Sequence, residues 1–315
     1  MSDQPENDTG APQVAIDPSG VVHLSGAVQS NNTDAIVAIL PMADRPAADS
    51  NFLGSTGVGS VSTGEALSVA DVVITSAGDL EVYAPSTAPH TWVCLDGITF
   101  PAASSSLHFT SLHLRNGWVA RGGSAVPSVA KEHNGIVHLI GAVASGSPAG
   151  AVAVLPQADR PAQNLYLAVE TVNGVASVEI TKLGSIYLFG ASITPFAPLD
   201  GISFPAKGAL GSASSIPFEN GWHSEDSAWG TGSPAGAVEG SGTVHLEGSM
   251  ATSEADTWSL TLPKALRPAS QVILPTYTES TTQGTIQIEP DGQVLCVGAF
   301  AAAYCNLSGI TFSAG

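Results

Sequence analysis

The sequence predicts an all-β protein built from three tandem antiparallel β-sandwich modules of jelly-roll type. Three observations lead to this fold class: a turn-rich and weakly charged composition, three motifs that each occur three times, and short apolar runs between turn residues. Of the 315 residues, 34 are Gly and 21 are Pro, while 43% are hydrophobic and only 11% are charged. A chain of this length is long enough for two or three domains with separate cores.

The same three motifs follow one another in each copy. They read Gly-x-Val-His-Leu-x-Gly, then Leu-Pro-x-x-x-Arg-Pro-Ala, then the closing motif Leu-x-Gly-Ile-x-Phe-x-Ala. Their starting residues are Gly20, Gly135 and Gly242, then Leu40, Leu155 and Leu262, then Leu95, Leu199 and Leu307. The motif His and the motif Arg are 22 residues apart in every copy. This constant spacing predicts that the three copies share one fold.

Within each copy, short apolar runs alternate with turn residues, which is typical of strands. In the second copy we predict strands at 135–143, 149–155, 165–169, 175–181, 185–189 and 201–204. Asn173-Gly174 indicates a tight hairpin, because Asn and Gly tolerate positive φ, and equivalent turns are expected at Ala77–Asp79 and Asp291-Gly292. No long stretch has a 3.6-residue period, so we expect very little helix.

The repeats divide the chain into modules and linkers. We expect a flexible N-terminus at 1–12, modules at 13–102, 133–206 and 241–315, and linkers at 103–132 and 207–240. From the motif Arg to the closing Leu there are 50 residues in the first copy, against 39 and 40 in the others. We assign this insertion to Asn51–Gly64 and predict an exposed loop there, because Gly and Ser dominate it.

Two sets of polar residues recur, the histidines His23, His138 and His245 and the arginines Arg45, Arg160 and Arg267. In a strand Val22 and Leu24 point to one face and His23 to the other. We therefore interpret the histidines as polar positions on half-exposed sheets. The alternative is a three-His metal site around a threefold axis. The arginines are interpreted as scaffold, with each guanidinium on a carboxylate or a free carbonyl.

Partner contacts are expected in the parts that the copies do not share. The candidates are Asn51, Phe52 and Leu53 in the insertion and Trp118, Trp222 and Trp229 in the linkers. We expect Trp118 and Trp222 to anchor the linkers on module edges. The alternative is that these two form a sugar-stacking platform with Trp229. Cys296 and Cys305 are either a disulfide across a hairpin or two buried thiols.

Charge and motif content exclude several functions. The formal net charge is -18, with 27 acidic residues against 9 Lys and Arg, so nucleic acid and anionic membranes are poor partners. No apolar run is long enough for membrane insertion, and the acidic N-terminus does not resemble a signal peptide. No catalytic, phosphate-binding or cofactor motif is present, and we expect no carboxylate to recur at equivalent positions in all three copies. We expect no cofactor and no repeated active site, although a single site in one copy stays open.

The ordered motifs resemble a known family. Asn-Gly-Trp at 116–118 and 220–222, followed by the three repeated motifs, is similar to the module at the C-terminal ends of bacteriophage tail fibres and minor tail proteins. Actinobacterial phages and phage-tail-like contractile injection particles carry such modules. The resemblance covers nearly the whole chain after residue 13. Members are commonly trimers of a one-module chain, so three copies in one chain suggest either a homo-oligomer or an intrachain pseudo-trimer.

The resemblance implies a non-enzymatic structural or receptor-binding component of a virion tail or of an extracellular tail-like particle. It would be assembled in the host cytoplasm, would contact other tail or baseplate proteins, and would bind a cell-surface glycan or protein through module loops. One alternative is a purely structural cap, collar or baseplate protein. A second is a secreted carbohydrate-binding or polysaccharide-active protein.

Overall fold

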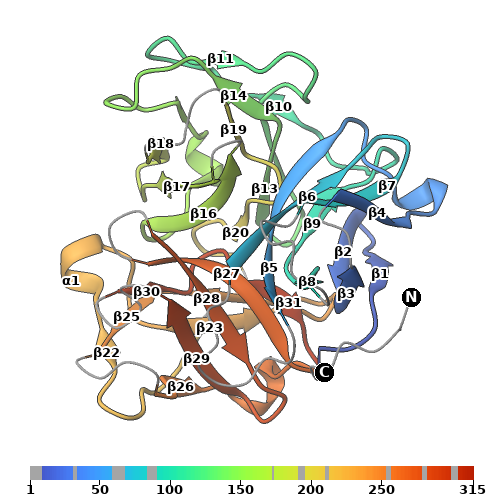
Figure 1. Cartoon of the computed structure of the whole chain (residues 1–315). Helices are drawn as coiled ribbons and strands as arrows, with labels where there is room; N and C mark the ends of the chain where they lie inside the picture. The colour runs from blue at the N-terminus through green and yellow to red at the C-terminus, as the bar shows by residue number, and fades with distance from the viewer. Residues whose placement is uncertain are drawn as a thin grey trace.

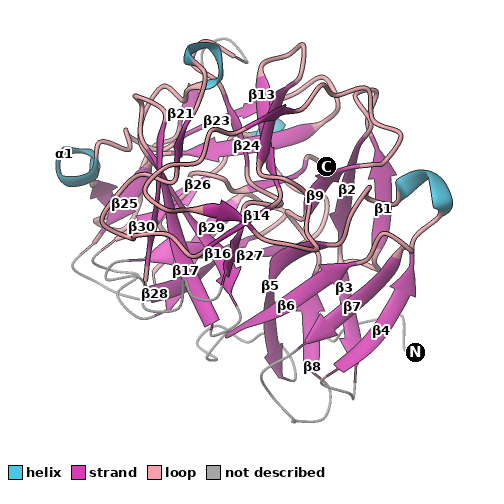
Figure 2. Cartoon of the chain, turned by 90° about the horizontal axis from the view of Figure 1, so that it is seen from above, coloured by secondary structure: helices cyan, strands magenta, loops and turns pink. Residues whose placement is uncertain are grey.

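The computed structural model describes residues 9–30, 34–58, 68–83, 91–171, 174–190, 196–209, 213–252, 257–278, 282–298 and 304–315. It is an all-β protein of three antiparallel modules, coloured blue to cyan, green, and orange to red in Figure 1. The strands dominate the view from above in Figure 2. We call strands β1 to β9 module 1, β10 to β20 module 2 and β21 to β31 module 3.

Module 1 packs two sheets against each other. The inner sheet has the order β1 (Gln13–Ile16), β2 (Val21–Ser25), β9 (Thr99–Pro101). The outer sheet has the order β3 (Ala27–Ser30), β8 (Thr91–Cys94), β5 (Ser50–Val58), β6 (Ser68–Ile74), β7 (Asp79–Tyr83), β4 (Asp34–Ile39). Val22 and Leu24 of β2 are buried between the sheets with Phe100, while His23 lies on the other face, as predicted.

Module 2 repeats this arrangement. Its inner sheet is β10 (Thr110–Ser111), β12 (Ser128–Lys131), β13 (Ile136–Ile140), β20 (Ser203–Pro205). Its outer layer is β11 (Val119–Ala120), β14 (Ala142–Ala144), β19 (Phe196–Pro198), followed by β16 (Leu165–Thr171), β17 (Gly174–Ile180), β18 (Ser185–Phe189), β15 (Ala153–Val154). Each run predicted for the second copy overlaps a strand, but the run 135–143 divides into β13 of the inner sheet and β14 of the outer layer, and β19 was not predicted. Position 173 of the predicted Asn-Gly hairpin lies outside the described residues.

Module 3 has the same two layers. The inner sheet is β21 (Ser214–Ser215), β23 (Ala235–Val238), β24 (Thr243–Glu247), β31 (Thr311–Ser313). The outer sheet is β22 (His223–Ser224), β25 (Ser249–Ala251), β30 (Cys305–Asn306), β27 (Val272–Thr278), β28 (Thr282–Ile288), β29 (Gln293–Gly298), β26 (Leu260–Thr261). The short helix α1 (Asp226–Trp229) precedes β23. A disulfide joins Cys296 to Cys305 in the module 3 core, so these cysteines are not two thiols.

Two sequence interpretations of local structure are corrected. Residues 51–58 were predicted as part of an exposed loop, but they form most of β5, which pairs with β6 and β8. The rest of the predicted insertion, 59–64, lies outside the described residues. The segments interpreted as linkers also carry strands: β10, β11 and β12 lie within 103–132, and β21, β22 and β23 within 207–240. These strands complete the sheets of the module that follows.

The three modules close a ring around a pseudo-threefold axis. The equivalent strands β5, β16 and β27 contact one another pairwise and lie together near the centre of Figure 1. Each module has a separate hydrophobic core, so the axis is a junction between cores and not a single shared core. The ring confirms that the three copies form one intrachain assembly.

Candidate functional site

The closing motif brings neighbouring modules into contact at the axis. Its glycines have positive φ, and a side chain on any of them would collide with an apolar residue of the next module. Gly97 of module 1 faces Leu274 of module 3, Gly201 of module 2 faces Phe52 of module 1, and Gly309 of module 3 faces Leu167 of module 2. The three contacts are cyclic, as a threefold ring requires. Glycine is used here because the backbone must approach closely.

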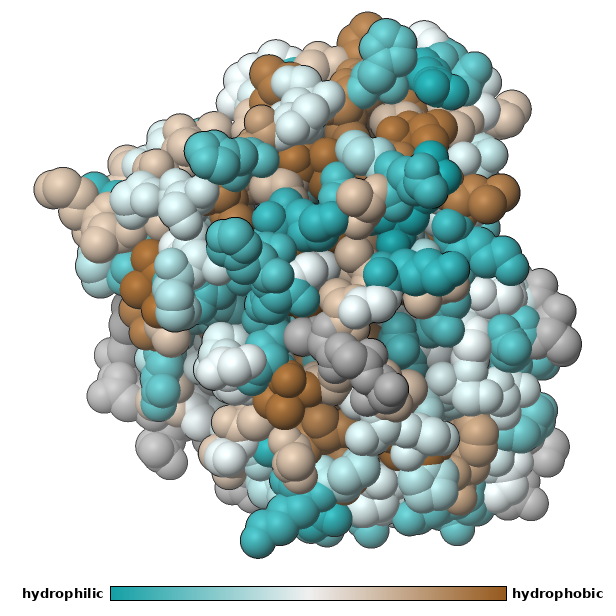
Figure 3. Space-filling model, turned by 180° about the vertical axis from the view of Figure 1, so that it is seen from behind, coloured by the Kyte–Doolittle hydropathy of each residue, from teal (hydrophilic) through white to brown (hydrophobic). Residues whose placement is uncertain are grey.

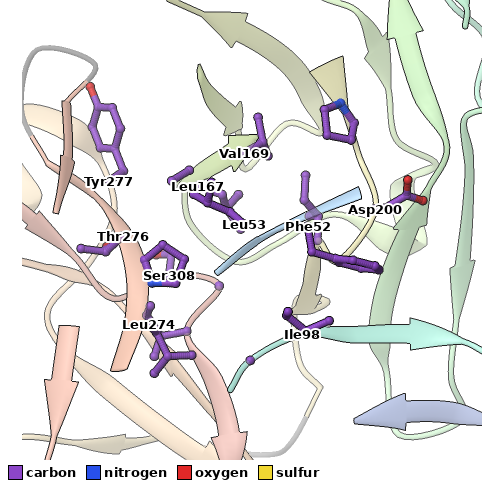
Figure 4. Close-up of a pocket in the computed structure, with 18 of the residues that line it drawn as sticks. Phe52, Leu53, Ile98, Leu167, Val169, Asp200, Leu274, Thr276, Tyr277 and Ser308 are labelled. Carbon is purple, nitrogen blue, oxygen red and sulfur yellow. The ribbon is translucent and has the colours of Figure 1, made fainter. Parts of the chain in front are cut away.

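A cavity of about 80 Å³ lies at this meeting point. Figure 4 shows that side chains of all three modules surround it, among them Phe52, Leu167 and Leu274. Such a volume holds a few water molecules at most. We therefore regard the axial cavity as a packing feature and not as a ligand site.

Two buried carboxylates bridge the modules beside this cavity. Asp96 Oδ1 accepts a hydrogen bond from the amide of Gly26 at 2.9 Å, and the nearby backbone amide of Ile273 in module 3 favours the charged carboxylate. Asp200 Oδ1 accepts the equivalent bond from Gly141 at 2.8 Å, and the nearby backbone amide of Asn51 in module 1 favours the charged carboxylate. Burial raises the pKa of each carboxyl to about 7, although the amide donors lower it. Both side chains are structural, since they hold backbone groups of two modules together.

The third module junction uses neutral groups instead. Ser308 of module 3 stands where the other copies have Asp. Asn306 donates its side-chain amide to the Tyr166 carbonyl of module 2. This junction therefore has the same cyclic geometry without a titratable bridge.

The ring nitrogen Nε2 of each repeated histidine contacts the carboxylate of an acidic residue. His138 Nε2 lies 2.7 Å from Glu132 Oε1, His23 Nε2 lies 3.3 Å from Asp17 Oδ2, and His245 Nε2 contacts Glu239. Each acid stands six residues before its His. The expectation that no carboxylate recurs in all three copies is therefore wrong. These acids lie before the Gly at which the repeated motif begins, so the motif does not contain them. His138 and His245 are 5% and 4% exposed, so the expectation of half-exposed positions is wrong for these two.

These pairs also lie at module junctions. Ser19 donates to Glu132 Oε2 at 2.7 Å across the junction of modules 1 and 2, and Asn134 donates to Glu239 Oε2 at 2.7 Å across the next. His23 lines a cavity of about 260 Å³ between modules 1 and 3. Although burial opposes it, hydrogen bonds from His23 and His138 lower the pKa values of Asp17 and Glu132.

The geometry does not match a metal site or a catalytic triad. Among the residues that the structure describes, no group of three or more His, Cys, Asp or Glu side chains is placed to hold a metal ion. In a serine triad the imidazole lies between the hydroxyl and the carboxylate. Here the carboxylate of Glu132 lies between Ser19 and His138, so no imidazole is adjacent to the hydroxyl. The pairs are best described as junction scaffold.

The arginines support hairpin turns. Arg45 Nε donates to the Leu40 carbonyl at 3.1 Å, and its side chain lies against the turn glycine Gly78. The equivalent pairs are Arg160 with Leu155 at 3.2 Å and Arg267 with Leu262 at 2.9 Å. The sequence interpretation of these residues as carbonyl-binding scaffold agrees with this geometry.

The structure does not bring the other candidate contacts together on one surface. Phe52 is 4% exposed and packs on Phe100 with 5.7 Å between ring centroids, because it belongs to the module 1 core. Asn51 and Leu53 are half-buried beside the axial cavity. Trp118 and Trp222 are each 4% exposed and donate to Ser147 and Thr257, as anchors should. Phe52, Trp118 and Trp222 are therefore too deeply buried to be surface contacts.

Trp229 has a different environment. It packs at the junction of modules 2 and 3 against Tyr166 and Tyr304, with centroid distances of 5.4 and 4.9 Å. Tyr277 completes this aromatic cluster. The sugar-stacking platform of three tryptophans is therefore absent, because only Trp229 is even partly accessible.

An accessible aromatic surface does exist on module 2, which the sequence analysis did not single out. Tyr187 and Phe189 alternate along β18, and their rings stack with centroids 6.2 Å apart and 21° between planes. Glu179 of β17 lies directly opposite Tyr187. We call Glu179, Tyr187 and Phe189 the module 2 aromatic face. Its sequence signal is the two-residue spacing of aromatic side chains in a strand.

The rest of the surface gives fewer indications of a binding site. The face in Figure 3 is mostly hydrophilic or neutral, with hydrophobic side chains in separate small patches. No helix in the described part of the chain has the length and apolar character of a membrane span.

Comparison with known proteins does not assign the chain to a family. No protein-family model matches the chain, and no curated protein matches it significantly. A crystal structure of Sqt1 from Saccharomyces cerevisiae aligns with 93% of this chain and 83% of that chain at 14% identity and a TM-score of 0.13. A TM-score this low carries no argument about fold or function.

Proposed function

We propose that this chain is a non-enzymatic structural and receptor-binding component of a phage tail or phage-tail-like particle, located at a fibre or tail tip. The observation that carries the proposal is the closed ring of three equivalent modules. Modules with the same ordered motifs are commonly trimers of one-module chains, and a single chain with three copies reproduces that arrangement by itself.

Two further features support the proposal. Within the described residues, the repeated His and Arg side chains and the Asp of the first two closing motifs are engaged in scaffold contacts, which supports a non-enzymatic role. The buried disulfide between Cys296 and Cys305 is typical of proteins that work outside a reducing cytosol. Both features suit a component of an extracellular particle.

Intact particles provide the test. Gold-labelled antibodies against this chain should bind the distal end of the tail in electron micrographs, and the purified full chain should compete with particles for adsorption to host cells. A label confined to a collar, cap or baseplate interior, with no competition, would favour the purely structural alternative. Particles that lack the chain altogether would overturn the proposal.

A further inference from the structure

We infer that the module 2 aromatic face binds an uncharged saccharide chain. This inference rests on the proposed receptor-binding function and gives that function a site and a ligand class. It places the contact on the outer surface of a sheet and not in the insertion or the linkers.

The stacked rings provide an apolar platform. Tyr187 and Phe189 stand two residues apart on β18, so they project from the same face of the sheet, while the alternating residues Ile186 and Leu188 are fully buried in the core. Phe189 is 36% exposed and Tyr187 is half-buried. Ile186 and Leu188 supply the core contacts of β18, so the exposed aromatic pair on the other face is not needed for that core. Rigid aromatic rings with accessible faces are typical of binding surfaces.

A carboxylate is held beside the platform. Glu179 pairs with Tyr187 on one side and with Tyr166 of β16 on the other, in direct cross-strand register. The Tyr166 hydroxyl donates to Glu179 Oε1 at 3.0 Å. Tyr166 is itself fixed in the aromatic cluster with Tyr277 and Trp229, so it orients the carboxylate. Within the described residues Glu179 accepts a side-chain hydrogen bond at Oε1 only, so its Oε2 can accept hydroxyl donors.

This combination fits a sugar better than other ligands. A pyranose presents C–H groups on one face and hydroxyl donors at its rim, which match aromatic rings with an adjacent acceptor. The net charge of -18 and the Glu179 carboxylate repel phosphate-bearing or uronic acid chains. The same charge opposes an anionic membrane surface. An uncharged saccharide chain is therefore the favoured occupant.

The equivalent positions of the other copies do not reproduce the face. Module 1 has Glu81 and Tyr83 in place of Tyr187 and Phe189, and the Tyr83 hydroxyl donates to Glu81 at 2.7 Å. Module 3 has Leu295, which is 4% exposed, and Val297. Only module 2 pairs two stacked aromatic rings with a neighbouring carboxylate at this place among the described residues.

Affinity electrophoresis of the full chain tests the inference. The gels would contain dextran, mannan, galactomannan or xyloglucan, with polygalacturonate as the anionic comparison. We expect at least one neutral polymer, and not polygalacturonate, to retard the protein. Phe189→Ala and Tyr187→Ala should each weaken this binding about tenfold or more, as loss of a central aromatic contact does. Glu179→Gln should weaken it less, because the platform stays intact.

Tyr83→Ala is the matched control, since it removes an exposed aromatic ring from the equivalent strand of module 1. It should bind as the unmodified chain does, and melting curves should show that all variants are folded. If binding to a neutral polymer survives both ring substitutions, the site is wrong. If no neutral polymer binds while the chain still competes for host adsorption, the ligand class is wrong and the receptor function stands. A chain that binds the polymer through Phe189 but is absent from particles would instead refute the proposed function alone.

Discussion

The closing-motif glycines set how closely the modules approach one another. At Gly201 the backbone has φ +76°, and a Cβ would lie 2.8 Å from Cδ1 of Phe52 in the neighbouring module. Two separate penalties would follow from a side chain here, one for the left-handed backbone and one for the collision. The collision penalty arises from the contact between two modules, whereas the backbone penalty arises within the turn itself.

Substitution separates the two penalties. Gly201→Ala should lower the free energy of unfolding by about 1 kcal/mol for backbone strain and by about 1 to 3 kcal/mol more for overpacking. Gly208→Ala is the control, because Gly208 has φ +85° but no atom within 4 Å of its added Cβ. Urea denaturation of both variants measures the difference. Equal losses would show that the junction accommodates the methyl group.

At the scale of single residues, strand periodicity predicts correctly which side chains are buried. The alternation in Val22-His23-Leu24 placed the two apolar side chains in the core correctly. It could not place the partners of the histidines, because which acid meets an imidazole depends on a turn and, at Glu132, also on a neighbouring module. The recurrence of an acid six residues before each His was nevertheless readable from the sequence.

The strand β5 shows why composition gave a wrong prediction of a loop at 51–58. The segment 51–58 contains glycines that suggested a loop, but they lie inside β5. A Cβ at Gly57 would lie 2.6 Å from the Trp92 ring, and a Cβ at Gly54 would crowd the Cys94 carbonyl. Glycine occurs in this strand because a large neighbouring ring and a backbone approach it closely. Contacts of this kind connect residues about 40 positions apart, so local pattern does not reveal them.

The disulfide joins β29 to β30, which are separated by β27 and β28 in the order of the sheet. It gives a prediction at this scale. Cys296 and Cys305 are nine residues apart in sequence, so opening the loop should cost about 2 to 3 kcal/mol of unfolding free energy. A Cys296→Ala, Cys305→Ala double variant should unfold at lower temperature than the oxidised chain. Reductant should lower the melting temperature of the unmodified chain and leave that of the double variant unchanged. An equal response of both proteins to reductant would contradict this role.

At the scale of the whole molecule, the three junctions differ in chemistry although they share one geometry. The equivalent residues Asn51, Tyr166 and Ile273 each meet the next module. Tyr166 enters an aromatic cluster, Ile273 packs with Trp92 and Cys94, and the backbone amide of Asn51 lies beside the Asp200 carboxylate. These differences specify the order of modules around the axis.

The junction carboxylates make stability depend on pH. Asp96 and Asp200 have a pKa of about 7 in the folded chain, mainly through burial, against 3.8 as the ordinary value. Between these two pH values the folded chain binds more protons than the unfolded chain, so the free energy of unfolding falls as pH rises. The stabilisation is fully present below about pH 4 and lost above about pH 7, with a magnitude on the order of 4 kcal/mol for each group.

Urea denaturation at several pH values checks this. The Asp96→Asn, Asp200→Asn double variant should lose most of the decline between about pH 4 and pH 7. Asp17 and Glu132 act in the opposite direction, because their lowered pKa values give stability that is lost as pH falls through the acid range. An unchanged pH profile in the double variant would show that the two junction groups titrate normally.

The union of three modules in one chain has a consequence for valency. A trimer of identical chains carries every surface feature three times, and simultaneous engagement multiplies its affinity. Here the paired rings of Tyr187 and Phe189 occur on one module, so each molecule offers a single contact of that kind. A particle that relies on it gains avidity only from the number of molecules that it displays.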